Sequence, residues 1–159
     1  MTTNLKLTSH QELYQQDYYQ WLNTTAELLR SRQLDDVDFD NLIEEIEDMG
    51  GSQRRELQSR LIVLLMHLLK YQYQPSMRSS SWRGTIFEQR RQIALLIKNS
   101  PSLKPYYLEI FSECYSDAIN EASAETNLPL SAFPVESPFL PLDVINLDFI
   151  STLVNTEED

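Results

Sequence analysis

Apolar residues recur at intervals of three and four along most of the chain, which is typical of helices that bury one face. The pattern predicts five helices, at about residues 10–30, 39–49, 52–72, 85–98 and 102–126. Ser9 and Glu12 form a capping box at the first start. Asp38 is placed to cap the second helix, and Gly50 and Gly51 are predicted to end it, because glycine tolerates the left-handed conformation that closes many helices.

The middle of the chain is the most apolar part. Between Leu61 and Leu69 the third predicted helix is apolar on nearly every side, which a water-soluble protein permits only for a surrounded segment. We therefore expect this helix to form the centre of the core.

The segment after residue 126 has a different pattern. Prolines at 129, 134, 138 and 141 alternate with large apolar residues, which favours an ordered strap packed on the helices, with a short helix near 142–146. The fold predicted is all-α, a five-helix bundle-like domain over residues 1–150 with a Pro-rich C-terminal strap. Residues 151–159 are predicted to be a flexible acidic tail.

Length and composition narrow the class of protein. The chain has 159 residues, 42% of them hydrophobic, with 3 Gly and 1 Cys, which fits one globular domain without disulfides. Its start lacks the apolar core of a secretory signal, and its longest aliphatic run, 61–66, is too short to span a bilayer. We expect a soluble cytoplasmic protein without membrane contact.

Charge is segregated along the chain. Residues 1–49 hold 3 basic and 11 acidic groups, residues 50–104 hold 10 and 2, and residues 105–159 hold 0 and 11. The net charge of -11 argues against duplex nucleic acid as a partner. Two interpretations of the basic segment stay open: the acidic helices neutralise it, or part of it binds an anion.

The segment before the fourth predicted helix is the candidate anion site. Free amides at a helix start attract phosphate or carboxylate, and arginines add bidentate contacts. The candidate residues are Arg78, Ser81, Trp82, Arg83 and Thr85. The alternative is that the serines and Thr85 cap the helix while the arginines meet acidic neighbours.

No complete catalytic set is present, and no metal ligand set or cofactor motif is found, so we predict no metal and no cofactor. Arg60 and His67 are the weak catalytic candidates, because their spacing places them on about the same helix face. The pair resembles the Arg and His of helical ribonuclease-toxin domains, although Leu61 follows Arg60 where those domains usually carry a polar residue. The alternative is a structural His67 bonded to a carboxylate of the second helix.

Two further clusters are predicted to be structural. Glu44, Glu45, Glu47 and Asp48 crowd one helix, and we expect the arginines at 54, 55 and 60 to pair with them. Cys114 stands at helical spacing between apolar residues, which predicts an inert buried thiol.

Six ordered motifs carry a family resemblance: LIEEIEDMG at 42–50, HLLKYQYQP at 67–75, RSSSWRGTI at 78–86, EQRRQI at 88–93, ETNLP at 125–129 and FPVESPF at 133–139. Together they resemble the bacterial family of domain of unknown function 29. The resemblance implies an all-helical fold and lends no catalytic residue, because the family has no established activity. The chain departs from the usual pattern at Ser137, where members commonly carry Cys, and at Tyr71, where Trp is common.

The function predicted is a non-enzymatic helical interaction module that binds a protein partner or self-associates. The alternative is an RNA- or nucleotide-directed, ribonuclease-like activity that uses Arg60 and His67, with the anion site on phosphate. A third hypothesis takes the acidic fifth helix and tail as a decoy surface for a basic protein.

Overall fold

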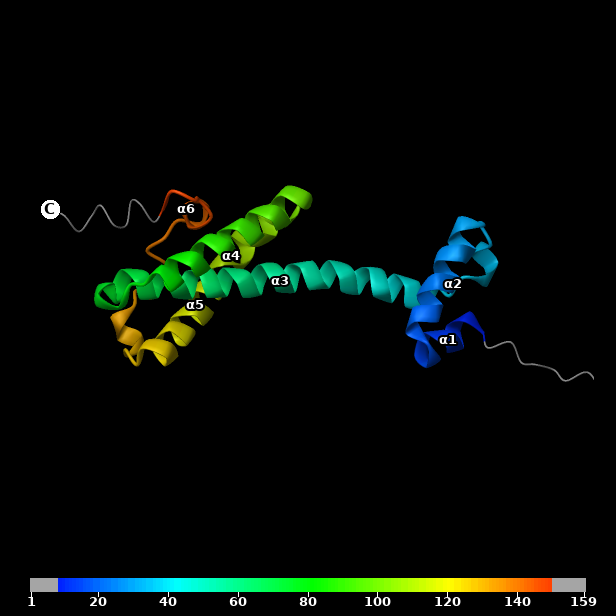
Figure 1. Ribbon diagram of the computed structural model, residues 1–159, viewed down its shortest axis with the longest axis horizontal. Helices are drawn as coiled ribbons and strands as arrows, with labels where there is room; N and C mark the ends of the chain where they lie inside the picture. The colour runs from blue at the N-terminus through cyan, green and yellow to red at the C-terminus, as the bar shows by residue number, and fades with distance from the viewer. Residues whose placement is uncertain (1–8, 150–159) are drawn as a thin grey trace, which may run out of the picture. The chain divides into compact units, whose positions relative to one another are not determined.

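The computed structural model describes residues 9–149, and this part of the chain is helical and contains no strand, which confirms the all-α prediction (Figure 1). The helices are α1 His10–Gln16, α2 Tyr18–Arg30, α3 Phe39–Tyr73, α4 Ser80–Asn99, α5 Leu103–Thr126 and α6 Pro141–Val144. Short 3-10 turns lie at Leu34–Asp36, Pro75–Met77 and Leu130–Ala132. The predicted acidic tail, 151–159, lies outside the described residues.

The chain divides into two compact units, residues 1–51 and 52–159. We call them unit 1 and unit 2 and describe each by itself. Unit 1 holds α1, α2 and the first part of α3, and unit 2 holds the rest of α3 with α4, α5 and α6. Whether residues 1–150 fold as one domain stays a prediction.

The first predicted helix is two helices, so its expected extent over 10–30 was wrong. Asp17 has a non-helical backbone, with φ -151° and ψ 88°, and its carboxylate accepts a hydrogen bond from the Gln20 amide at 3.0 Å. Asp17 therefore ends α1 and caps α2. The predicted capping box of Ser9 and Glu12 is confirmed.

The expected break at Gly50 and Gly51 was also wrong, because α3 continues through both glycines for 35 residues. Neither glycine adopts the left-handed conformation that a helix end requires. A glycine inside a helix costs about 1 kcal/mol relative to alanine, which the flanking turns on both sides outweigh. The second and third predicted helices are thus one element.

Unit 2 contains the main core, and the prediction that the apolar middle lies at its centre is confirmed. Leu61, Leu64, Leu65, Leu68 and Leu69 of α3 are fully buried. They form a cluster with buried side chains of α4 and α5, among them Ile86, Ile93, Tyr107, Phe111, Tyr115 and Ala118. Figure 1 shows α4 and α5 alongside this part of α3.

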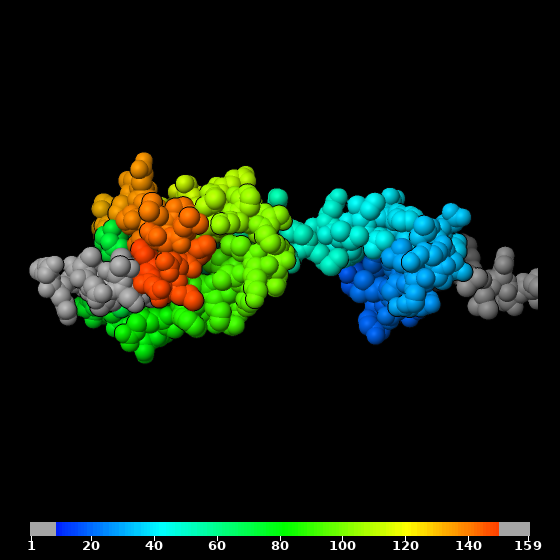
Figure 2. Space-filling model, turned by 90° about the horizontal axis from the view of Figure 1, so that it is seen from above, coloured from blue at the N-terminus to red at the C-terminus, as the bar shows by residue number. Residues whose placement is uncertain are grey.

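The Pro-rich segment is an ordered strap on these helices, as predicted (Figure 2). Phe133, Phe139 and Val144 are buried in the same cluster. Two tyrosines of α5 hold the strap by its backbone: Tyr107 donates to the Pro141 carbonyl at 2.5 Å, and Tyr115 donates to the Pro134 carbonyl at 2.6 Å. Proline carbonyls keep their acceptor strength, so they suit this role.

Arg90 of α4 is the unusual member of the core, because its side chain is 1% exposed. Its Nε donates to the Val144 carbonyl at 2.7 Å, while its Nη2 is buried without a hydrogen-bond partner. Burial lowers the pKa of the guanidinium to about 10. Arg90 thus fastens the end of α6 to α4 through one charge-assisted hydrogen bond.

Cys114 is buried within α5, as predicted, and burial raises the pKa of its thiol to about 12. Because the thiolate is the reactive form, this side chain is inert in the folded protein. Among the described residues, no helix has the length and apolar content that crossing a bilayer requires.

We predict that Arg90→Ala lowers the free energy of unfolding of unit 2 by about 2–4 kcal/mol, because it leaves the Val144 carbonyl unpaired and a cavity in the core. Arg55→Ala, on an exposed arginine of α3, is the matched control and should change it by less than about 0.5 kcal/mol. Urea unfolding followed by Trp82 fluorescence, in chains carrying Trp21→Phe, measures both. Equal stabilities for the two variants would contradict the role given to Arg90.

Candidate functional site

The interior of unit 1 is built around one indole. Trp21 of α2 is fully buried, and its ring stacks on the His10 ring at a centroid distance of 5.6 Å. Tyr14 meets it edge-on at 4.8 Å, and Tyr18 stacks at 6.0 Å. Aromatic pairs at such distances are favourable beyond the area that they bury. These contacts join α1 to α2.

His10 makes hydrogen bonds through both ring nitrogens. The Thr25 hydroxyl donates to the Trp21 carbonyl at 2.7 Å, so its oxygen can only accept from His10 Nε2, also at 2.7 Å. His10 Nδ1 in turn accepts from the Asp38 amide at 2.9 Å. This network requires the neutral imidazole with its proton on Nε2. His10 is therefore a structural residue, closed to metal binding by its own hydrogen bonds.

Asp38 caps α3, as the sequence predicts. Its carboxylate accepts from the Asn41 amide at 3.4 Å and from the Asn41 side chain at 2.6 Å. The same carboxylate accepts from Trp21 Nε1 at 3.2 Å, and it is buried. Asp38 thereby ties the start of α3 to the centre of α2.

Glu45 joins a later turn of α3 to α1 and α2. It accepts hydrogen bonds from the Tyr14 hydroxyl at 2.5 Å and the Tyr18 hydroxyl at 2.6 Å. These bonds lower the pKa of Glu45 and raise the pKa of Tyr14 to about 12. The expected arginine partner was wrong for Glu45, and Arg60 pairs instead with Glu56 on its own helix at 2.9 Å.

With Asp38 and Glu45 turned toward α1 and α2, another face of α3 is left to solvent. Phe39, Ile43, Ile46 and Met49 lie along it at spacings of four, three and three residues, and their side chains are between 45% and 62% exposed. Exposed acids repeat the spacing one residue later, at Asp40, Glu44 and Glu47. We call the four apolar residues with these three acids the α3 stripe.

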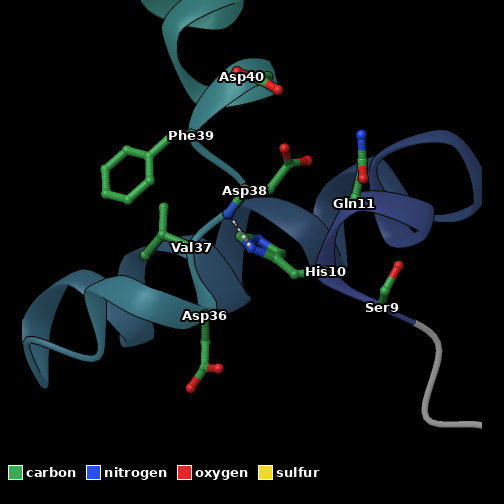
Figure 3. A pocket seen from close by; sticks show the side chains of 8 residues that line it. All are labelled: Ser9, His10, Gln11, Asp36, Val37, Asp38, Phe39 and Asp40. Atoms are coloured by element: carbon green, nitrogen blue, oxygen red, sulfur yellow. Dashed lines mark hydrogen bonds between the residues drawn. The ribbon is translucent and has the colours of Figure 1, made fainter.

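A pocket of about 380 Å³ lies beside the first turn of the stripe (Figure 3). Its lining includes His10, Val37 and Phe39 together with three aspartates, Asp36, Asp38 and Asp40, and also Ser9 and Gln11. Figure 3 shows the three aspartates pointing in different directions. No group of three or more His, Cys, Asp or Glu among residues 9–149 is arranged to hold a metal ion. The pocket adds acidic surface next to Phe39.

Four of the five predicted anion-site residues, Ser81, Trp82, Arg83 and Thr85, lie inside α4, because the helix begins at Ser80 and not near Thr85, while Arg78 precedes it. Ser79 is the cap, and its hydroxyl accepts from the Trp82 amide at 3.2 Å. Ser81 and Arg83 are exposed in the first turns, while Thr85 is half-buried. An anion bound at the start of α4 would compete with the Ser79 hydroxyl for the Trp82 amide.

Two other members of the predicted site are held by their neighbours. Arg78 Nε donates to the Tyr71 carbonyl at 2.6 Å, and its guanidinium lies 4.5 Å from the centre of the Tyr71 ring. Lys70 Nζ lies 4.8 Å from the centre of the Trp82 ring and forms an ion pair with Glu125 at 2.6 Å. Anion binding by these residues stays a prediction.

Arg60 and His67 meet different groups. Arg60 contacts Glu56 and also donates to the Gln89 side chain at 3.2 Å. His67, about 10 Å further along the axis, hydrogen-bonds through Nδ1 to the Val63 carbonyl at 2.8 Å. From the sequence, a carboxylate of the second predicted helix was offered as the partner of His67. In the structure the partner is a backbone carbonyl of its own helix. Neither residue lines the pocket beside the stripe, and a catalytic role for the pair stays a prediction.

The stripe itself escaped the sequence analysis. Its four apolar residues belong to the helix predicted over 39–49 and were not singled out, since helical spacing indicates that a face is apolar but not what covers it. The closely spaced acidic residues beside them are the feature of the sequence that indicates an exposed face.

Comparison with known proteins identifies one family. The family described as Domain of unknown function DUF29 matches residues 13–150, which is most of the chain. No curated protein and no solved structure matches the chain.

The half-buried position of His67 gives a pH prediction. Burial lowers its pKa below the ordinary 6.5, so the unfolded chain takes up this proton more readily than the native state. The free energy of unfolding should therefore fall as the pH drops from 7 to 5, and His67→Gln should make that fall shallower. Urea midpoints at pH 5, 6 and 7 for the two chains measure the difference. The same pH slope in both would show that His67 is not linked to stability.

Proposed function

We propose that this chain, which belongs to the DUF29 family, is a non-enzymatic interaction module that binds a protein through the α3 stripe of unit 1. The observation that carries the proposal is the row of four large apolar side chains, each about half exposed, along one helix face. Water-soluble monomers rarely leave such a contiguous row uncovered. A helix face with anchors at these spacings is a common element of protein recognition.

The small interior of unit 1 supports the same proposal. Among its described residues, the buried side chains are those of Trp21, Thr25, Val37 and Asp38. Helical units of roughly 40 residues seldom bury enough apolar surface to be stable without a staple or a partner. A protein that covers the stripe supplies the missing burial.

The size of the stripe indicates what the partner must offer. Full burial of a large apolar side chain contributes about 1.5–3 kcal/mol, so covering the open half of each one adds about 1 kcal/mol. The resulting total, about 4 kcal/mol, does not exceed the free energy that association itself requires. A partner therefore has to contact more than the apolar row, and the neighbouring surface is acidic. A partner with cationic groups beside its own apolar residues fits this surface.

We predict that Ile43→Ser with Ile46→Ser abolishes partner capture while leaving the helix content unchanged, because both side chains are half exposed. Binding is measured with a tagged chain that captures protein from an extract of the source cell. The same tagged chain is also tested for capture of an untagged chain expressed beside it. Circular dichroism checks the fold. Leu130→Ser, at a leucine of unit 2 that is also half exposed, is the matched control and should bind like the wild type. Equal capture by all three chains would refute the proposal.

A further inference from the structure

The outer face of α4 has the opposite character to the α3 stripe. Within unit 2, Ile86, Arg90 and Ile93 of α4 are buried, and the opposite side of the helix is open. That side carries Phe87 and Leu95, which are 57% and 39% exposed, and three exposed cations, Arg83, Arg91 and Lys98. Arg91 is paired with Glu88 of the same helix at 2.9 Å, so it has to share this partner or exchange it when it binds another acid. We call these five residues the α4 face. It combines apolar anchors with positive charge on one helix side.

We propose that a second copy of this chain binds the α3 stripe, and that it does so with its α4 face. This inference rests on the proposed function and names the partner. Each surface supplies what the other lacks: apolar anchors bordered by acids on α3, and apolar anchors bordered by cations on α4. Such complementarity favours the contact and opposes pairing of two like surfaces.

The residue spacing allows an antiparallel pairing of the two helices. Placing Asp40 opposite Lys98 brings Ile43 opposite Leu95 and Glu47 opposite Arg91, because both helices then advance by three and by four residues in opposite directions. Both sets repeat at three or four residues, so each stays on one side of its helix. Two ion pairs thus flank one apolar contact.

One turn further, the same register places Phe87 opposite Gly51, the neighbour of Gly50. Gly50 lies on the stripe side of α3, and no neighbouring atom lies within 4 Å of the place where a Cβ would be. A glycine at this position leaves room for an aromatic ring to approach the helix backbone closely. The antiparallel direction also sets the acids at the positive end of α3 against the cations at the negative end of α4.

Each copy carries both surfaces, and in the pair that we propose each stripe meets the α4 face of the other copy, so the contact is made twice. Each contact covers Ile43 with Leu95 and sets Phe87 against the two glycines, so the doubled contact covers twice this apolar surface. Exposed ion pairs contribute under about 1 kcal/mol each and are screened by salt. The charges therefore select the partner and its direction, while apolar burial supplies most of the affinity.

Charge exchange between full-length chains tests the inference. One variant combines Asp40→Lys with Glu47→Lys, and another combines Arg91→Glu with Lys98→Glu. Each variant alone sets like charges against each other, so its self-association should weaken by at least about 10-fold. Mixed in equal amounts, the two restore opposite charges in both contacts and should form a heterodimer. Sedimentation velocity over a range of concentrations measures all three samples and the wild type.

The control changes charge equally elsewhere: Glu109→Lys with Glu121→Lys on exposed positions of α5 should self-associate like the wild type. A wild type that stays monomeric, variants that associate as the wild type does, or a mixture that fails to pair overturns the inference. Monomeric protein that still captures another protein through Ile43 and Ile46 overturns only this inference and leaves the proposed function standing. Monomeric protein that binds single-stranded RNA through Arg91 and Lys98 also overturns it. Circular dichroism of each variant, together with rescue in the mixture, separates lost contact from lost fold.

Discussion

The structure depends on how the apolar face of α3 is covered. In unit 2 the leucines of this helix lie under α4 and α5 and are fully buried. In unit 1 the buried side chains are those of Trp21, Thr25, Val37 and Asp38, and the apolar residues of the α3 stripe stay half exposed. One helix therefore supplies a core at one end and an open surface at the other, because burial rather than helix propensity decides what each segment does.

The sequence predicted the fold class, the central apolar helix, the cap at Asp38 and the packed strap, because each rests on a local pattern with a strong physical cause. It failed at Asp17 and at Gly50. No proline or glycine stands near Asp17 to mark a break, and its cap on the Gln20 amide is what separates α1 from α2. Gly50 lies in a helix that packing and capping stabilise beyond its immediate neighbours.

The candidate site was harder to predict than the fold, because exposure depends on contacts between distant parts of the chain. Helical spacing identified Ile43 and Ile46 as one apolar face but gave no information on what covers it. The networks of His10 and Glu45 join residues about thirty positions apart, and no local motif announces them. Conversely, the sequence offered Arg78 and Trp82 as anion-binding residues, because it does not show the contacts with Tyr71 and Lys70 that the fold creates.

Charge segregation along the chain gains a physical meaning from these surfaces. Acidic and basic groups mixed on one face would pair within that face, as Glu88 and Arg91 do on α4 at 2.9 Å. The stripe of α3 carries acids alone, so its field is not cancelled locally and can act on another molecule. The same field opposes contact between two stripes, which keeps their apolar rows from meeting each other. A surface that is apolar and charged with one sign thus selects its partner by repulsion as much as by attraction.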